Sequence, residues 1–102
     1  YPKPYPRYER RGQILKVVFS NLRSPVNVQE YIEEARGMVI EHISKELKIE
    51  DIVFEKQKGQ EFLGVKLDVK GMPTSEALAV LVEAVTMYEN FLLMKRIEKE
   101  LY

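Results

Sequence analysis

Cysteine is absent from this 102-residue chain, and histidine occurs once, as His42. Without a thiol the chain cannot form a disulfide, a thiolate zinc site, an iron–sulfur cluster or a cysteine nucleophile. A single histidine offers no metal-ligand spacing and no partner for acid–base chemistry, and a lone histidine beside a helical apolar stripe is usually a packed or surface residue. We therefore expect a protein that is not an enzyme and needs no metal or cofactor.

Long apolar runs are also missing. No run approaches the roughly 20 residues that span a bilayer, and the amino-terminal end is polar, without a signal-peptide core. The formal net charge is zero, so no overall charge would draw the chain to nucleic acid or to an anionic membrane. These absences predict a cytoplasmic protein with no membrane partner. The acidic residues are 14 Glu against 2 Asp, a bias that resembles the composition of thermophile proteins.

What the sequence does contain is enough apolar material for one core. Hydrophobic residues make up 45% and charged residues 31%, which is typical of a single folded domain. Residues 1–12, YPKPYPRYERRG, differ from the rest because three prolines remove backbone donors and favour extended conformations. We predict a flexible tail at 1–12 and one domain at 13–102.

Alternating and helical spacings define the predicted elements. The clearest alternation is in 61–70, where Leu63, Val65 and Leu67 share one face of a strand. The elements are a strand at 13–21, a helix at 27–47, strands at 51–57 and 61–70, and a helix from Thr74 or Ser75 to near the end. The order predicts an α+β fold, β-α-β-β-α, with a three-stranded antiparallel sheet and two helices packed on one face.

The last helix has more apolar surface than one sheet face can cover. It carries two apolar stripes, and the sequence does not decide which stripe faces the core. A surplus rich in aromatic residues and methionine is typical of an oligomer or partner interface, with the strand at 61–70 as an alternative interface. The predicted interface residues are Leu78, Leu81, Val85, Tyr88 and Leu92 in one stripe and Val80, Met87 and Phe91 in the other.

The tail interleaves aromatic and basic residues. Aromatic rings can stack on bases while arginines meet phosphates, so RNA contact is one interpretation. A proline-rich arm that docks on another protein and a solvated tail are the others. The predicted RNA contacts are Tyr5, Arg7, Tyr8, Arg10 and Arg11.

The second half of the chain resembles the small dimerising subunit of the KEOPS complex, which makes threonylcarbamoyladenosine in tRNA. The strand LGVKLDVKG is followed by the helix opening Ser75-Glu76-Ala77-Leu78, and the first half matches in order, with QILKVVF before VQEYIEEARGMVIEHI. The resemblance implies a β-α-β-β-α fold and a non-catalytic subunit that dimerises and docks on a catalytic subunit.

The chain departs from the family pattern at polar positions of the last helix. Ala79 stands where the family usually has arginine, and Glu83 and Ala84 stand where it usually has an Asn-Ser pair. The resemblance therefore implies a diverged archaeal paralogue that dimerises with the standard small subunit or with itself, in a complex that contacts tRNA. Two alternatives stay open: a free-standing RNA-binding module that uses the tail and the outer sheet face, and a homodimeric ligand-binding protein.

Overall fold

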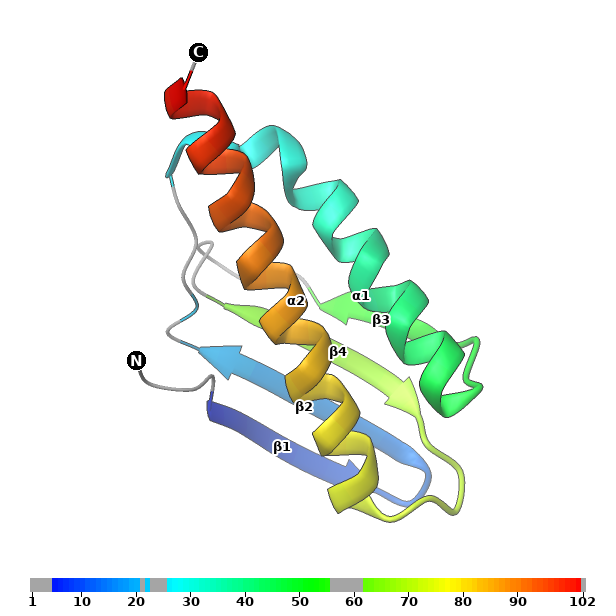
Figure 1. Cartoon of the computed structure of the whole chain (residues 1–102). Helices are drawn as coiled ribbons and strands as arrows, with labels where there is room; N and C mark the ends of the chain where they lie inside the picture. Colours follow the sequence, from blue (N-terminus) through cyan, green and yellow to red (C-terminus); the bar gives the residue numbers. More distant parts are fainter. Residues whose placement is uncertain (1–4, 21, 23–25, 56–61, 102) are drawn as a thin grey trace.

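The computed structural model describes residues 5–20, 22, 26–55 and 62–101. Its strands form one sheet in the order β1-β2-β4-β3, and all neighbours in the sheet are antiparallel (Figure 1). The elements along the chain are β1 (Tyr5–Arg11), β2 (Ile14–Ser20), the 3-10 helix η1 (Val26–Tyr31), α1 (Ile32–Leu47), β3 (Ile52–Glu55), β4 (Leu63–Asp68) and α2 (Thr74–Leu101).

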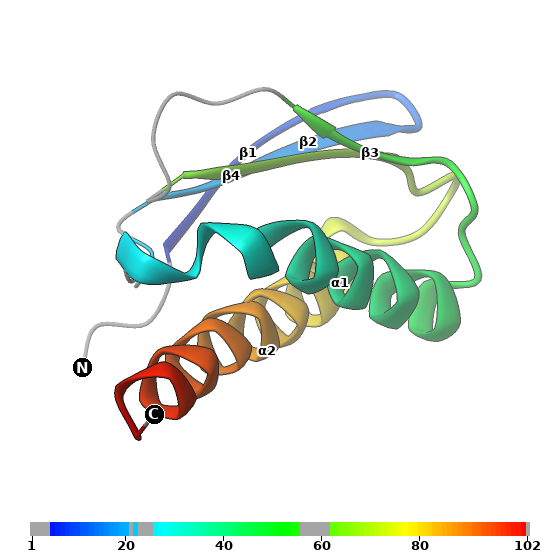
Figure 2. The same ribbon diagram turned by 90° about the horizontal axis from the view of Figure 1, so that it is seen from above.

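Both helices cover the same face of the sheet (Figure 2). The alternation of the two central strands explains this arrangement, because Leu15, Val17 and Phe19 of β2 all point to the helices and are fully buried. Each lies opposite an equally buried residue of β4, in the pairs Leu15–Leu67, Val17–Val65 and Phe19–Leu63. The expectation of an α+β fold with an antiparallel sheet and two helices on one face is confirmed.

The predicted strand number was wrong, because the sheet has four strands and not three. The fourth, β1, lies in the segment predicted to be a tail and pairs with β2 from Tyr5–Ser20 to Arg11–Ile14. Proline is tolerated in an edge strand, where one side of the backbone needs no ladder partner. Pro6 therefore does not prevent β1 from closing this edge of the sheet.

A two-residue loop, Gly12-Gln13, joins β1 to β2. Gly12 has a φ of 60°, whereas Gln13 is not in the left-handed region. A glycine with positive φ at the first loop position alone is typical of a type II′ turn, which matches the twist of the flanking strands. The turn fixes the pairing register, so the side chains of β1 have defined faces.

The predicted helix at 27–47 is two elements. The chain forms the 3-10 helix η1 before the α-helix proper, and α1 ends where Lys48 adopts a left-handed conformation with a φ of 55°. The apolar stripe of α1 faces the sheet and α2. Its buried members are Ala35, Val39, Ile43 and Leu47.

Helix α2 begins at Thr74, directly after Pro73, as predicted. By length and composition alone it is apolar enough to cross a membrane, but the core helix of a soluble protein passes the same test. One side of α2 is packed in the core of this fold. Its buried residues are Ala77, Leu81, Ala84, Val85, Tyr88, Glu89 and Leu92.

Tyr88 should give the stability a dependence on alkaline pH. Burial raises the pKa of Tyr88 above 10, with Arg36 acting in the opposite direction and Glu33 in the same direction. The unfolded tyrosine therefore loses its proton first as the pH rises past about 10, and the free energy of unfolding falls. Denaturant titrations between about pH 8 and pH 11 should show a steeper fall for the wild type than for Tyr88→Phe. Identical slopes would contradict this.

Candidate protein interface

The structure decides which stripe of α2 faces the core. Leu81, Val85, Tyr88 and Leu92 are buried, with exposed fractions of 2% or less, and Leu78 is half-buried against the same core. Four of these five predicted interface residues therefore pack inside the protomer, and Leu78 alone of the five keeps part of its surface accessible. The sheet, α1 and η1 together cover this stripe.

The second stripe keeps apolar surface. Val80 and Phe91 are half-buried against the core, whereas Met87 is 37% exposed. Further along the helix the exposed fractions rise to 57% for Met94 and Ile97 and 73% for Leu101. We call Met87, Met94, Ile97 and Leu101 the α2 outer stripe.

The spacing of the α2 outer stripe is that of a packing seam. Met87, Met94 and Leu101 are seven residues apart, so they follow one line along the helix, and Ile97 lies three residues after Met94. Sequence reasoning missed Ile97 and Leu101 because the two stripes that it followed end before Ile97. The seven-residue interval was the signal that could have found them.

The C-terminal half of α2 extends past the sheet, and η1 covers only one of its sides (Figures 1 and 2). On that side the rings of Tyr31 and Phe91 meet edge to face at 6.5 Å, and the Lys95 ammonium lies 5.2 Å and 5.4 Å from their centroids. Lys99 contacts Glu30 of η1, and this hydrogen bond lowers the pKa of the Glu30 carboxyl. The α2 outer stripe lies away from these contacts.

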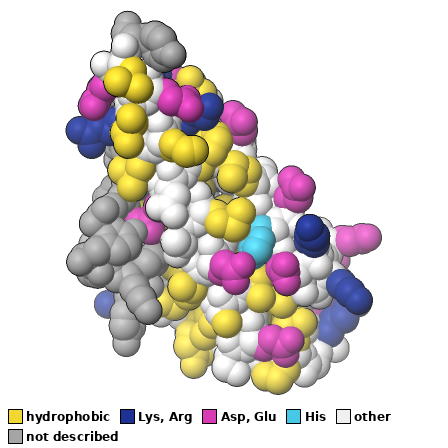
Figure 3. Space-filling view, viewed as in Figure 1, with side chains coloured by type: hydrophobic (Ala, Val, Ile, Leu, Met, Phe, Trp, Pro, Cys, Tyr) yellow, Lys and Arg dark blue, Asp and Glu magenta, His cyan; other side chains and the backbone are white. Residues whose placement is uncertain are grey.

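A hollow between the two helices continues the α2 outer stripe. It has a volume of about 300 Å³ and is lined by Met38, Glu41, His42, Lys45 and Met87. In Figure 3 hydrophobic side chains run along the outer end of α2 and reach the single histidine. This face therefore combines an apolar line with a shallow groove that has charged walls.

His42 takes part in a contact between the two helices. Its Nε2 lies 3.2 Å from the Oε1 of Glu83, an ion-pair distance without the alignment of a hydrogen bond. Within the described ranges no group of three or more His, Asp or Glu side chains could hold a metal ion.

Strand alternation separates the predicted RNA contacts onto two faces. Arg7 lies opposite the half-buried Val18, and Arg11 lies opposite Ile14, so both point away from the helices. Tyr8 and Arg10 lie opposite the buried Val17 and Leu15, on the helix side. These residues therefore do not form one aromatic and basic surface. The side chain of Tyr5 is outside the described part of the chain.

Arg10 is occupied by structural contacts. Its guanidinium donates to the carbonyl oxygens of Met72 at 2.6 Å and Lys70 at 2.9 Å and to the Thr74 hydroxyl at 2.9 Å. Its Nε also donates to the Gly12 carbonyl at 3.0 Å. These bonds join β1 to the loop before α2, so Arg10 is not available to bind RNA.

Comparison with known proteins gives no relative to this chain: no protein family, curated protein or solved structure matches it.

Proposed function

We propose that this protein is a non-catalytic accessory subunit that dimerises with a partner subunit through the α2 outer stripe. The observation that carries the proposal is the line of exposed Met87, Met94 and Leu101 at seven-residue intervals on a helix whose opposite side is already in the core. Methionine-rich apolar surface outside a core is typical of contact with another protein.

The edges of the sheet are less suitable for pairing. β3 has only four residues, and β1 carries Pro6 together with charged side chains. Short, charged and proline-containing edge strands hinder pairing between sheets. This favours helix packing over the strand interface that we considered as an alternative.

Area arguments indicate a weak self-association and a stronger pairing with a complementary partner. Burying the exposed half of an aliphatic or methionine side chain contributes about 1 kcal/mol, so the four stripe residues supply about 8 kcal/mol to a symmetric pair. Association costs at least about 4 kcal/mol. A partner with a larger apolar face, such as a paralogous subunit, would bind more tightly.

The resemblance to the dimerising subunit of KEOPS supplies the proposed setting, a complex that makes threonylcarbamoyladenosine in tRNA. In that family the small subunit dimerises and is not itself catalytic. We propose that the partner is the standard small subunit of such a complex.

The experiment is a mixing test by analytical ultracentrifugation. This chain and the standard small subunit are run separately and together, at concentrations from about 1 to 500 µM. We expect a heterodimer at micromolar concentration and self-association only at the upper end. Two species that never combine would remove the proposed partner.

A double variant, Met94→Glu/Ile97→Glu, tests the surface itself. Both side chains are more than half exposed, so the substitutions leave the fold intact while placing charge in the seam. We expect the dimer signal to weaken at least about 100-fold in Kd, or about 3 kcal/mol. Val53→Glu is the control, because Val53 is equally exposed, at 59%, but lies on β3. An effect of Val53→Glu alone would assign the interface to the sheet edge.

A further inference from the structure

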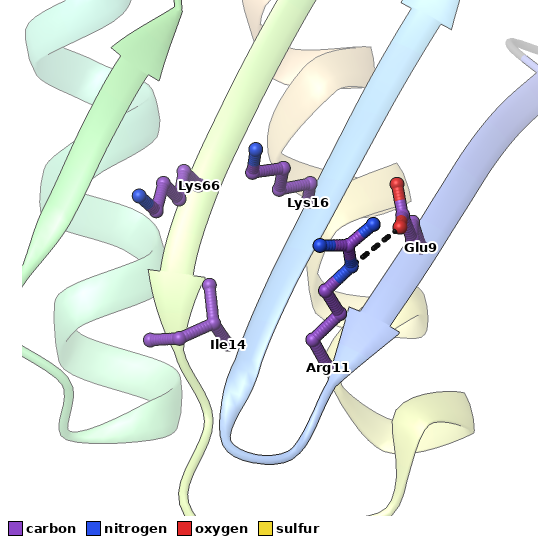
Figure 4. A pocket seen from close by; sticks show the side chains of 5 residues that line it. All are labelled: Glu9, Arg11, Ile14, Lys16 and Lys66. Atoms are coloured by element: carbon purple, nitrogen blue, oxygen red, sulfur yellow. Dashed lines mark hydrogen bonds and ion pairs between the residues drawn. The ribbon is translucent and has the colours of Figure 1, made fainter.

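The face of the sheet opposite the helices carries a cluster of cations. A hollow of about 280 Å³ on this face is lined by Glu9, Arg11, Ile14, Lys16 and Lys66. Figure 4 shows Lys16 and Lys66 beside each other on β2 and β4, with Arg11 and Glu9 next to them on β1. Three cations and one carboxylate therefore share this small area.

The two lysines face each other across neighbouring strands, an arrangement that is unfavourable for the stability of a sheet. Lys16 and Lys66 are direct partners in the β2–β4 register, and like charges directly opposite each other destabilise a sheet. Glu9 lies opposite Lys16 in the β1–β2 register and pairs with Arg11 at 2.8 Å, so one carboxylate offsets only part of the charge of three cations. Among the described residues no ion pair involves either lysine, and the geometry leaves both ammonium groups available to an external anion.

The nearby carboxylates limit the extent of the positive area. Asp68 is on the same face, opposite Ile14, and its Oδ1 accepts the backbone N–H of Lys70 at 2.9 Å. Glu55 of β3 lies opposite Gly64, at the other margin. A broad anionic membrane would bring these carboxylates against its own charge, whereas a narrow line of phosphates would meet the three cations and only the Glu9 carboxylate.

We propose that the outer face of the sheet binds the phosphodiester backbone of a nucleic acid strand, through Lys16, Lys66 and Arg11. The residues that line the hollow are charged or aliphatic, and contacts from lysine and arginine to phosphates carry no base-sequence information. Binding is therefore independent of base sequence. The site is on the face opposite both helices, so it does not depend on dimerisation through the α2 outer stripe.

Fluorescence anisotropy with a labelled single-stranded RNA, a DNA of the same sequence and the corresponding RNA duplex tests the proposal on the full chain. Three contacts to a single strand predict a slope of log K against log salt of about −2. Saturable binding of the single-stranded RNA or of the DNA at about 50 mM salt supports the proposal. A difference between the RNA and DNA affinities shows whether the 2′-hydroxyl contributes. No saturable binding below about 1 mM protein would overturn it.

Lys16→Gln/Lys66→Gln is the decisive variant, and Lys48→Gln/Arg96→Gln is its control. Both pairs are exposed and remove the same charge, but Lys48 follows α1 and Arg96 lies on α2, away from the outer face of the sheet. We expect the first variant to weaken binding about tenfold or more and to reduce the salt slope by about 1.4, and the second to change binding less than about twofold. Equal losses in both variants would show attraction by net charge alone and overturn the site.

Vesicles that contain phosphatidylserine complete the test. Binding to the vesicles without binding to either nucleic acid strand would assign the lysines to a lipid surface and contradict the proposal. A melting temperature of Lys16→Gln/Lys66→Gln at or above that of the wild type is also expected, because the variant removes the opposed charges. A large fall in melting temperature would indicate a structural role for the pair.

Discussion

Replacing Leu81 with glutamate is expected to unfold the protein at room temperature. Leu81 is fully buried in the core between α2 and the sheet. Loss of the leucine side chain alone costs about 2–5 kcal/mol, and an unpaired carboxylate in the same place costs several more. A domain of this size has only about 5–15 kcal/mol of stability.

Circular dichroism and denaturant titration distinguish this result from an interface effect. Leu81→Ala should remain folded with a free energy of unfolding lower by about 2–5 kcal/mol. Met94→Glu, on the same helix but 57% exposed, should change the stability by less than about 0.5 kcal/mol. A Leu81→Glu protein that stays folded but no longer binds its partner would contradict this packing. It would mean that the stripe with Leu81 lies on the surface of α2 and the other stripe lies in the core.

The second large effect is expected for Arg10→Ala. The Arg10 guanidinium bonds three segments: the Gly12 turn, the loop at 70–72 and the first residue of α2. Hydrogen bonds from a charged group are worth about 1.5–3 kcal/mol each when shielded. Because part of this group is exposed, we expect a total loss of about 2–3 kcal/mol and faster hydrogen exchange in β1.

Arg7→Ala is the matched control for Arg10→Ala. Arg7 lies on the same strand but is exposed on the outer face, so its removal should cost less than about 0.5 kcal/mol. Arg10→Lys should recover only part of the stability, because one ammonium cannot reproduce the fork of donors. Equal stabilities for the Arg7 and Arg10 variants would show that the bonds of Arg10 contribute nothing.

The elements that sequence reasoning found are those with strong apolar periodicity. Leu15, Val17 and Phe19 identify β2 because every second residue is large and apolar. The start of α2 follows Pro73 directly, since proline cannot continue a preceding strand ladder and suits a helix start. Where a pattern has one burial period and a clear boundary, it predicts both the type and the position of an element.

β1 was missed because its pattern is not apolar. Pro6, Tyr8 and Arg10 share the helix side, and only a pairing partner shows that they form a strand. The signal in the sequence was Gly12-Gln13, a two-residue glycine loop before a strong strand, which is typical of a hairpin. The three prolines led to the prediction of a tail instead, although proline is acceptable in an edge strand of a sheet.

The interface could be predicted in kind but not in position. Both stripes of α2 are apolar, and the choice between them depends on the width of the sheet, which β1 increases. The lysine pair of the outer face was also hidden, because Lys16 and Lys66 become neighbours only through the β2–β4 register. Contacts between residues 50 positions apart are set by topology and not by local spacing.

The central position of the β2–β4 pair has a consequence for how the chain folds. Ile14 pairs with Asp68 across more than 50 residues, so the middle of the sheet must wait for a slow loop closure that the two outer hairpins do not need. Such distant pairings make folding slower than that of helical bundles, whose contacts are mostly local. During synthesis, the apolar side of β2 remains uncovered until α2 has emerged, and this interval is when the nascent chain is most exposed to aggregation.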